Sequence, residues 1–269
     1  DKKNLMNTFL MCDPTYYKIE YEINPWMNKN NLVDNRKALE QWNKLYNLLS
    51  NQLLCNIKKL EPKEGLPDLT FIANAGLVYK NIFIPSNFYY SDRRPESLPI
   101  QIYFVSEGIK IRKIPPDQYF EGGGDTLPAG DILFGGYPFR SELSAYKSIE
   151  RKIHCQIIPL RLTNPWFYHL DTCFCPLKDR MLLYYPAAFS PASQKTIIKY
   201  FSTRLIVDSD EALRFACNSI VIENKIVIPI NCPKTKYMLE KEGFSVYEID
   251  ISEFIKAGGG PKCVILSIN

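Results

Sequence analysis

The sequence predicts a single α/β domain made of five similar helix–strand units. Five stretches show the apolar spacing of amphipathic helices, and short apolar runs typical of strands separate them. This alternation returns about every 50 residues along the 269-residue chain, a period seen in propellers and repeat arrays. No low-complexity linker interrupts it, so we expect residues 1–269 to form one domain.

The helix with the clearest pattern is expected within residues 32–53, where apolar side chains fall on one face: Leu39, Trp42, Leu45, Tyr46, Leu49 and Leu53. Four further helices are predicted at about 97–108, 142–153, 192–202 and 233–242. Strands are predicted at 7–12, 70–79, 81–86, 131–136, 155–162, 181–186, 204–209, 219–230, 244–251 and 264–268. Within 219–230, the pair Glu223–Asn224 indicates a tight hairpin turn.

The composition excludes several classes of protein. Hydrophobic residues make up 46% of the chain and charged residues 23%, which is typical of a globular domain. The net charge of +4 is modest and its basic residues are scattered, so nucleic acid is not an expected partner. No apolar run reaches the roughly 18 residues of a membrane span. The first residue is aspartate and no signal-peptide pattern follows, so a preceding segment of the natural chain is compatible with the sequence.

Eight cysteines lie mostly within apolar runs, which favours buried, reduced thiols and a cytoplasmic location over a disulfide framework. Cys173 and Cys175 lack a second pair at zinc-binding spacing, and the chain has two histidines. We therefore expect neither a metal nor a cofactor.

A candidate nucleophile is Cys263, at the end of the stretch AGGGPKC. Three consecutive glycines let a backbone pass close to another group, which suits the approach to a ligand. The positive charge of the neighbouring Lys262 would favour the thiolate form of Cys263. The alternative is a surface turn followed by a structural cysteine.

The two histidines differ in their surroundings. His154 starts an apolar strand and is expected to be structural. His169 and Asp171 alternate in YHLDT, which would place both on one strand face, where they can share a substrate. An ordinary strand end is the alternative for this stretch.

Charged loops suggest the two ends of a substrate. Glu121 and Asp125 flank a second glycine triplet in FEGGGD and favour a cationic ligand, whereas this stretch taken alone is more typical of a solvated acidic turn. Arg93, Arg94 and Arg140 offer forks that bind a carboxylate. A thiol, an imidazole, acids and arginines together fit the attack of a thiolate on the guanidinium carbon of an amino acid such as arginine.

Five pieces of the chain, in order, resemble the guanidine-modifying superfamily of arginine deiminases, dimethylarginine dimethylaminohydrolases, amidinotransferases and arginine dihydrolases. They are residues 67–79 (PDLTFIANAGLVY), 120–125 (FEGGGD), 136–142 (GYPFRSE), 168–172 (YHLDT) and 258–263 (GGGPKC). Residues 9–27 look most like the dihydrolases, which turn arginine into ornithine, ammonia and carbon dioxide. The resemblance implies a five-bladed α/β propeller, the pentein fold, with pseudo-fivefold symmetry and a central active site.

The resemblance also implies roles for individual residues. The catalytic set would be the nucleophile Cys263, the general acid–base His169 and its partner Glu121. Substrate contacts are implied for Asn24, Asn74, Arg93, Asp125, Arg140 and Asp171. Arg94 is an alternative to Arg93 because one residue of register separates them, and Asp68 is a weaker candidate.

Asn74 departs from the deiminase pattern, which has an aspartate at this place. An amide can donate a hydrogen bond to the carbonyl of neutral citrulline, whereas a carboxylate repels it. The family resemblance associates Asn74 and Asn24 with dihydrolases. We therefore predict an enzyme that hydrolyses a small molecule, L-arginine, in two steps. The sequence is compatible with a homo-oligomer. The alternatives are a single-step hydrolase giving citrulline, an amidinotransferase, and a non-catalytic arginine-binding module.

Overall fold

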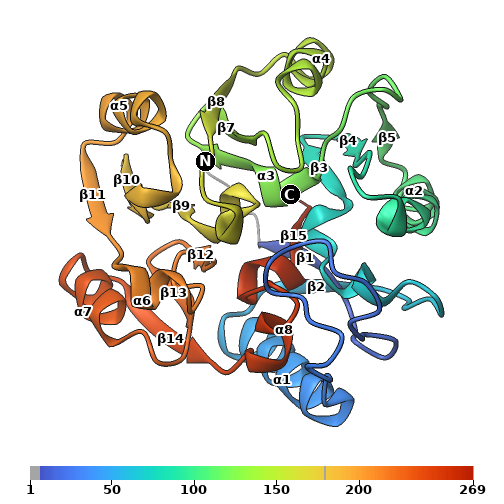
Figure 1. Cartoon of the computed structure of the whole chain (residues 1–269), viewed down its shortest axis with the longest axis horizontal. Helices are drawn as coiled ribbons and strands as arrows, with labels where there is room; N and C mark the ends of the chain where they lie inside the picture. Colours follow the sequence, from blue (N-terminus) through green and yellow to red (C-terminus); the bar gives the residue numbers. More distant parts are fainter. Residues whose placement is uncertain (1–6, 179, 269) are drawn as a thin grey trace.

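The computed structural model describes residues 7–178 and 180–268, which form five three-stranded sheets around a common centre (Figure 1). All five sheets have one topology, in which the first two strands pair antiparallel and the last two pair parallel. Parallel neighbours need a crossover connection, and an α-helix provides it in every sheet. The predicted five-bladed α/β propeller is confirmed.

Each blade runs from a first strand near the centre to a third strand nearer the rim. The strands, blade by blade, are β15 (Leu266–Ser267), β1 (Thr8–Cys12) and β2 (Asn56–Leu60); β3 (Gly76–Tyr79), β4 (Ile82–Pro85) and β5 (Lys110–Ile111); β6 (Thr126–Ala129), β7 (Ile132–Tyr137) and β8 (Ile157–Arg161); β9 (Phe174–Pro176), β10 (Met181–Tyr184) and β11 (Thr203–Ile206); β12 (Ile220–Ile222), β13 (Lys225–Pro229) and β14 (Ser245–Ile249).

The five crossover helices occupy the predicted stretches. They are α1 (Asn35–Asn47), α2 (Ser97–Ser106), α4 (Leu143–Ile153), α5 (Pro191–Tyr200) and α7 (Pro233–Lys241). The shorter helices are α3 (Gly122–Asp125), α6 (Ser209–Ala212) and α8 (Ser252–Ile255), the π-helix η1 (Leu48–Gln52), and the 3₁₀ turns η2 (Pro67–Thr70), η3 (Ile72–Ala75), η4 (Ser91–Glu96), η5 (Pro165–Phe167), η6 (Leu170–Thr172), η7 (Pro186–Ala188) and η8 (Pro261–Val264).

Helix α1 shows how local sequence sets a blade. The Asp34 side chain caps it by accepting a hydrogen bond from the backbone N–H of Lys37. Trp42 and Leu45 are buried, as predicted, but Leu39 is 41% exposed and its prediction as a core residue was wrong. The inward stripe instead includes Ala38 and the polar Gln41, whose amide donates to the Ser252 hydroxyl.

The ends of the described chain share one blade. β15, close to the C-terminus, pairs antiparallel with β1, with Phe9 opposite Ser267. This pairing closes the ring and brings the stretch around Cys263 beside the loop that follows β1.

The predicted strands at the centre begin later than expected. Residues 70–75 belong to 3₁₀ turns, and only Gly76–Tyr79 of the stretch 70–79 is a strand. His169 and Asp171 lie at a 3₁₀ turn before β9, so the prediction that they share a strand face was wrong. Cys263 likewise lies in η8 and not at the start of a strand. The chain must turn sharply here to run from one blade into the first strand of the next, a requirement that apolar patterning does not reveal.

Candidate active site

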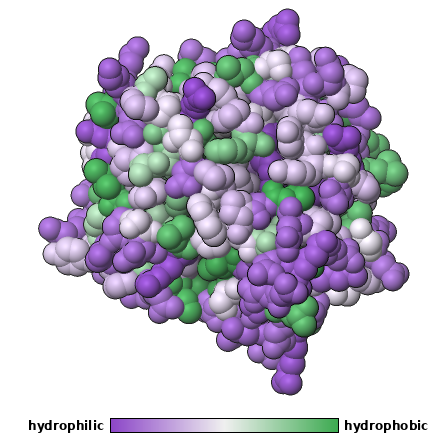
Figure 2. All heavy atoms as spheres, viewed as in Figure 1, coloured by the Kyte–Doolittle hydropathy of each residue, from purple (hydrophilic) through white to green (hydrophobic). Residues whose placement is uncertain are grey.

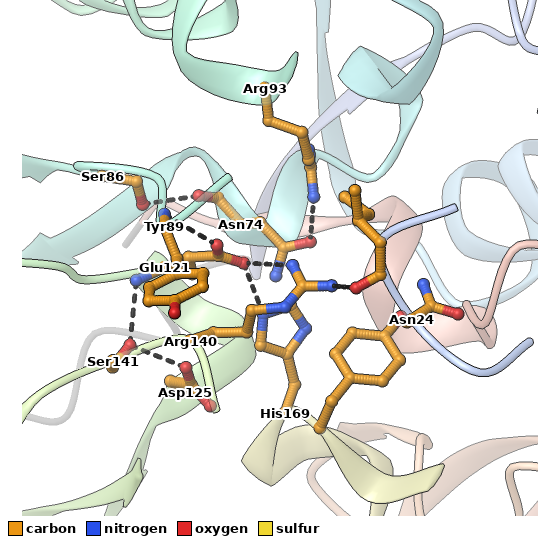
Figure 3. A network of polar contacts seen from close by, with 12 residues as sticks. Asn24, Asn74, Ser86, Tyr89, Arg93, Glu121, Asp125, Arg140, Ser141 and His169 are labelled. Carbon is orange, nitrogen blue, oxygen red and sulfur yellow. Dashed lines mark hydrogen bonds and ion pairs between the residues drawn. The ribbon is translucent and has the colours of Figure 1, made fainter. Parts of the chain in front are cut away.

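Four of the short turns at the centre carry functional side chains to a common point, and Figure 3 shows Asn74, Glu121 and His169 among them. Asn74 lies in η3, Glu121 precedes α3, His169 precedes η6, and Cys263 lies in η8. Each turn comes directly before the first strand of a blade. The propeller therefore brings together residues that are far apart in the sequence.

Glu121 and His169 form a buried pair. Glu121 Oε2 lies 2.7 Å from His169 Nε2 and accepts a 3.0 Å hydrogen bond from Arg140. Burial opposes ionisation of Glu121, but Arg140 and His169 outweigh it and hold its pKa at about 2. Burial lowers the pKa of His169 to about 4 despite the opposing effect of Glu121. His169 is thus neutral at pH 7, and with Nε2–H donated to Glu121, its Nδ1 is free to act as a base.

Cys263 and Asp171 form a second pair. Cys263 Sγ lies 3.7 Å from Asp171 Oδ2. Burial, reinforced by the Asp171 charge, raises the pKa of Cys263 well above its usual value. Lys262 lowers this pKa, in the expected direction, but burial has the larger effect. Burial also raises the pKa of Asp171 to about 7, and its Oδ1 has no hydrogen-bond partner among the described residues.

The arginines are distinguished by burial. Arg93 is buried and lines the pocket, whereas Arg94 donates to the backbone carbonyls of Phe88 and Tyr89 outside it. Arg93 Nε and Nη2 donate to Glu96, both at 2.8 Å. Arg140 is stacked between the rings of Tyr90 and Tyr168, each 4.7 Å away. Because Glu96 occupies most of the Arg93 fork, Arg140 has more free donors for a substrate carboxylate.

Asn74 has one fixed end and one free end. Its Oδ1 accepts a 3.0 Å hydrogen bond from Arg93, while its Nδ2 has no partner among the described residues and is buried. Asp68, the weaker sequence candidate, also lines the pocket and leaves Oδ1 unpartnered. Buried polar groups without partners are costly, so these atoms are suited to a polar ligand.

The front pocket is nearly closed, with a volume of about 10 Å³. Of the side chains above, its lining includes Asp68, Asn74, Arg93, Arg140, His169 and Cys263. Side chains fill the middle of the face seen in Figure 2, which is mostly hydrophilic with scattered hydrophobic residues. Loop 13–33 covers the pocket through Ile23, Asn24 and Met27. The Asn24 side chain is already hydrogen-bonded within the protein: Nδ2 donates to the Ala257 carbonyl, and Oδ1 accepts from the N–H of Trp26. A ligand of amino-acid size therefore needs this loop to move in order to bind.

Asp125 lies behind the site and does not line the pocket. Its oxygens accept from the Ser141 hydroxyl at 2.6 Å and from the backbone N–H of Leu170 at 3.1 Å. The latter contact fixes the turn after His169. The geometry therefore supports a positioning role for Asp125 in place of the substrate contact expected from the sequence.

Two residues of the site were missed by sequence reasoning. The Tyr168 hydroxyl donates to the Gly258 carbonyl at 2.7 Å. Asn218 Oδ1 accepts from the N–H groups of Lys262 and Cys263, and its Nδ2 donates to the Asp171 carbonyl. Asn218 precedes the first strand of the fifth blade, so an alignment of the five units would have pointed to it. His154, expected to be structural, ends α4 in a left-handed conformation away from the site.

Within residues 7–178 and 180–268, no group of three His, Cys, Asp or Glu side chains is arranged to hold a metal ion. In the same part of the chain, no helix has the length and apolarity required to cross a membrane.

Together, the propeller and its central Cys–His–Glu arrangement define the class: the chain belongs to the guanidine-modifying enzyme superfamily with the pentein fold. It is 32% identical to N(G),N(G)-dimethylarginine dimethylaminohydrolase of Mycobacterium tuberculosis, over 97% of this chain and 85% of that protein. It is 39% identical to the bifunctional arginine dihydrolase/ornithine cyclodeaminase ArgZ of Synechocystis, over 96% of this chain but 37% of ArgZ. The chain thus spans little more than a third of that relative. No family model matches the sequence.

A solved structure of the N-terminal domain of ArgZ superposes over 98% of both chains, with a TM-score of 0.94 and 37% identity. That domain is a variant covalently bound to a reaction intermediate. The present chain therefore matches the dihydrolase part of ArgZ as a whole domain.

Proposed function

We propose that this chain is an arginine dihydrolase, which converts L-arginine and two waters into ornithine, two ammonia and carbon dioxide. The observation that carries the proposal is Asn74, whose Oδ1 is held by Arg93 and whose buried Nδ2 is left to donate. A hydrogen-bond donor at this place suits the carbonyl oxygen of citrulline. The match to the whole N-terminal domain of ArgZ supports the same function.

In the proposed first step, the guanidinium lies in the front pocket beside the thiol of Cys263 and near the Asp171 carboxyl that contacts this thiol. Its positive charge counteracts the burial that keeps Cys263 protonated, so thiolate forms when the substrate is bound. The Cys263 thiol gives its proton to His169, and the sulfur forms a bond to the guanidinium carbon. His169 then returns this proton to the terminal nitrogen, the C–N bond breaks and ammonia leaves. Water then attacks the carbon, His169 takes its proton, and the C–S bond breaks to give citrulline.

The proposed second step repeats this chemistry on the citrulline carbonyl. Cys263 attacks the same carbon, ornithine leaves through its amine, and a thiocarbamate remains on the sulfur. Hydrolysis of the thiocarbamate gives carbamic acid, which decomposes to ammonia and carbon dioxide. Arg140 is proposed to bind the substrate carboxylate, supported by its free donors. A cytoplasmic location is also proposed, supported by eight buried cysteines without disulfides.

The test is the product of Asn74→Asp. An added carboxylate favours the cationic guanidinium but repels the citrulline carbonyl, so the first step survives and the second slows by roughly tenfold to a hundredfold. Chromatography of amino acids during turnover is expected to show ornithine from wild type and citrulline from the variant. Asn51→Asp, at an exposed position of the π-helix η1, is the matched control and should behave as wild type. Citrulline as the end product of wild type would instead establish a single-step hydrolase.

A further inference from the structure

A second cavity lies behind the catalytic cysteine. Its volume is about 230 Å³, against about 10 Å³ for the pocket in front of the thiol. Its walls come from four blades and include Phe9 of β1 together with Leu127, Phe174 and Ile220 of the first strands β6, β9 and β12. A water occupies about 30 Å³ of liquid volume, so this cavity has room for several.

Asp171 is the boundary between the two spaces. It lines the rear cavity, yet its Oδ2 lies 3.7 Å from Cys263 Sγ. Its buried Oδ1 has no hydrogen-bond partner among the described residues. Lys262 also lines the rear cavity, and among the described residues its ammonium makes no ion pair within 4.0 Å. One carboxyl side chain and one turn therefore separate the rear cavity from the sulfur.

The proposed reaction requires ammonia to be replaced by water next to the sulfur of Cys263. After the first C–N bond breaks, ammonia sits at the blind end of the pocket, while the amino-acid part of the substrate still fills the front under loop 13–33. Ammonia has to leave and water has to arrive before the adduct on Cys263 can be hydrolysed. A front route would require the loop to open and expose the adduct at every cycle.

We propose that the rear cavity is a separate passage through which ammonia leaves and water reaches Cys263, with Asp171 as its gate. This inference rests on the proposed hydrolysis of a guanidino substrate, and it holds for one hydrolytic step or two. A carboxyl that accepts a hydrogen bond from the thiol on one side and borders a cavity with room for water on the other is placed to exchange protons with both.

The test is to plug the passage at its outer end. Val221, a half-buried residue of β12, lines the rear cavity and lies away from the catalytic groups. For Val221→Trp we expect kcat to fall about tenfold, with the KM for arginine within twofold of wild type. Intact-mass measurement at steady state should show the adduct on Cys263 accumulating, while its formation in a single turnover keeps the wild-type rate. Ile206→Trp, on an exposed strand position outside the cavity, is the matched control.

Two results would overturn the passage: wild-type kcat in the plugged variant, or slowing of adduct formation by the same factor as kcat. If Val221→Trp does not fold, Ser267→Trp at the exposed rim of the cavity serves the same test. The product of the wild-type enzyme, ornithine or citrulline, tests the proposed function independently of these variants.

Discussion

The molecule contains two glycine triplets with the same letters and different surroundings. In 122–124, a Cβ on Gly122 would lie 2.6 Å from the backbone nitrogen of Gly76, and one on Gly123 would lie 3.1 Å from the Ala73 carbonyl oxygen. None of the three lines the pocket, so this triplet does not form its wall. Gly122 and Gly123 lie against the backbone of the neighbouring blade, whereas Gly124 lies against the side chains of Asn74 and His169.

The triplet 258–260 meets side chains instead of backbone. Gly258 contacts Tyr168 and Asn24, Gly259 lies against the ring of Phe71, and Gly260 lies against Asn218. Gly258 and Gly259 also line the pocket. The triplet 122–124 therefore lets two blades pack closely, whereas the triplet 258–260 forms part of the pocket wall next to Cys263.

The largest effect is expected at Cys263, which follows the second triplet in the sequence. Cys263→Ser should fold normally and lose essentially all turnover, because a hydroxyl is far less ionised than a thiol near neutral pH. The check is ammonia release from L-arginine together with the unfolding midpoint. Cys155→Ser, a buried cysteine outside both the front pocket and the rear cavity, is the control and is expected to lose stability with little change in chemistry. Activity of Cys263→Ser above a few per cent would remove it from the mechanism.

The next largest effect tests the first triplet. In Gly124→Ala the new Cβ would overlap Asn74 Nδ2 and lie 3.3 Å from His169 Cγ. Both side chains must shift, and displacements of about 1 Å at an active site cost on the order of a hundredfold in rate. We expect kcat/KM to fall by about that factor. A variant as active as wild type would show that the blades can separate without disturbing the site.

A smaller effect is expected from the second triplet. Gly258 has a φ of +83°, and a Cβ there would lie 2.8 Å from the Tyr168 hydroxyl. Gly258→Ala should raise the KM for arginine roughly tenfold, because Tyr168 stacks on Arg140, and should cost about 1 kcal/mol of stability. Gly65→Ala, at φ +79° with open space around it, carries the same backbone strain and should leave KM unchanged. Equal KM values in the two variants would contradict the role of the 258–260 wall.

The smallest effect concerns charge beside that wall. Asp171, whose pKa is raised to about 7 by burial, attracts a guanidinium only when ionised, and its ionised fraction increases with pH. Between pH 6.5 and 7.5 we therefore expect kcat/KM to rise about threefold. Glu121 and His169, with pKa values of about 2 and 4, contribute nothing in this window. Asp171→Asn should be less active and should lose this rise, and a variant that keeps it would assign the ionisation to another group.

The sequence by itself determined the propeller and the chemical types at its centre. Helical spacing and capping by Asp34 are local properties, so the crossover helices could be located in advance. The five ordered motifs likewise identified Cys263, His169 and Glu121. Each of these inferences depends on residues close together in the chain or on motifs already associated with a fold.

Only the tertiary structure decided which neighbours these residues have. It distinguished Arg93 from Arg94, moved Asp125 behind the site, and placed Asn218 against the turn of Cys263. It also gave Asp171 contact with both the sulfur and the rear cavity. The physical reason is that burial and charge act through space, so the same carboxyl or glycine has a different role depending on which blade packs against it.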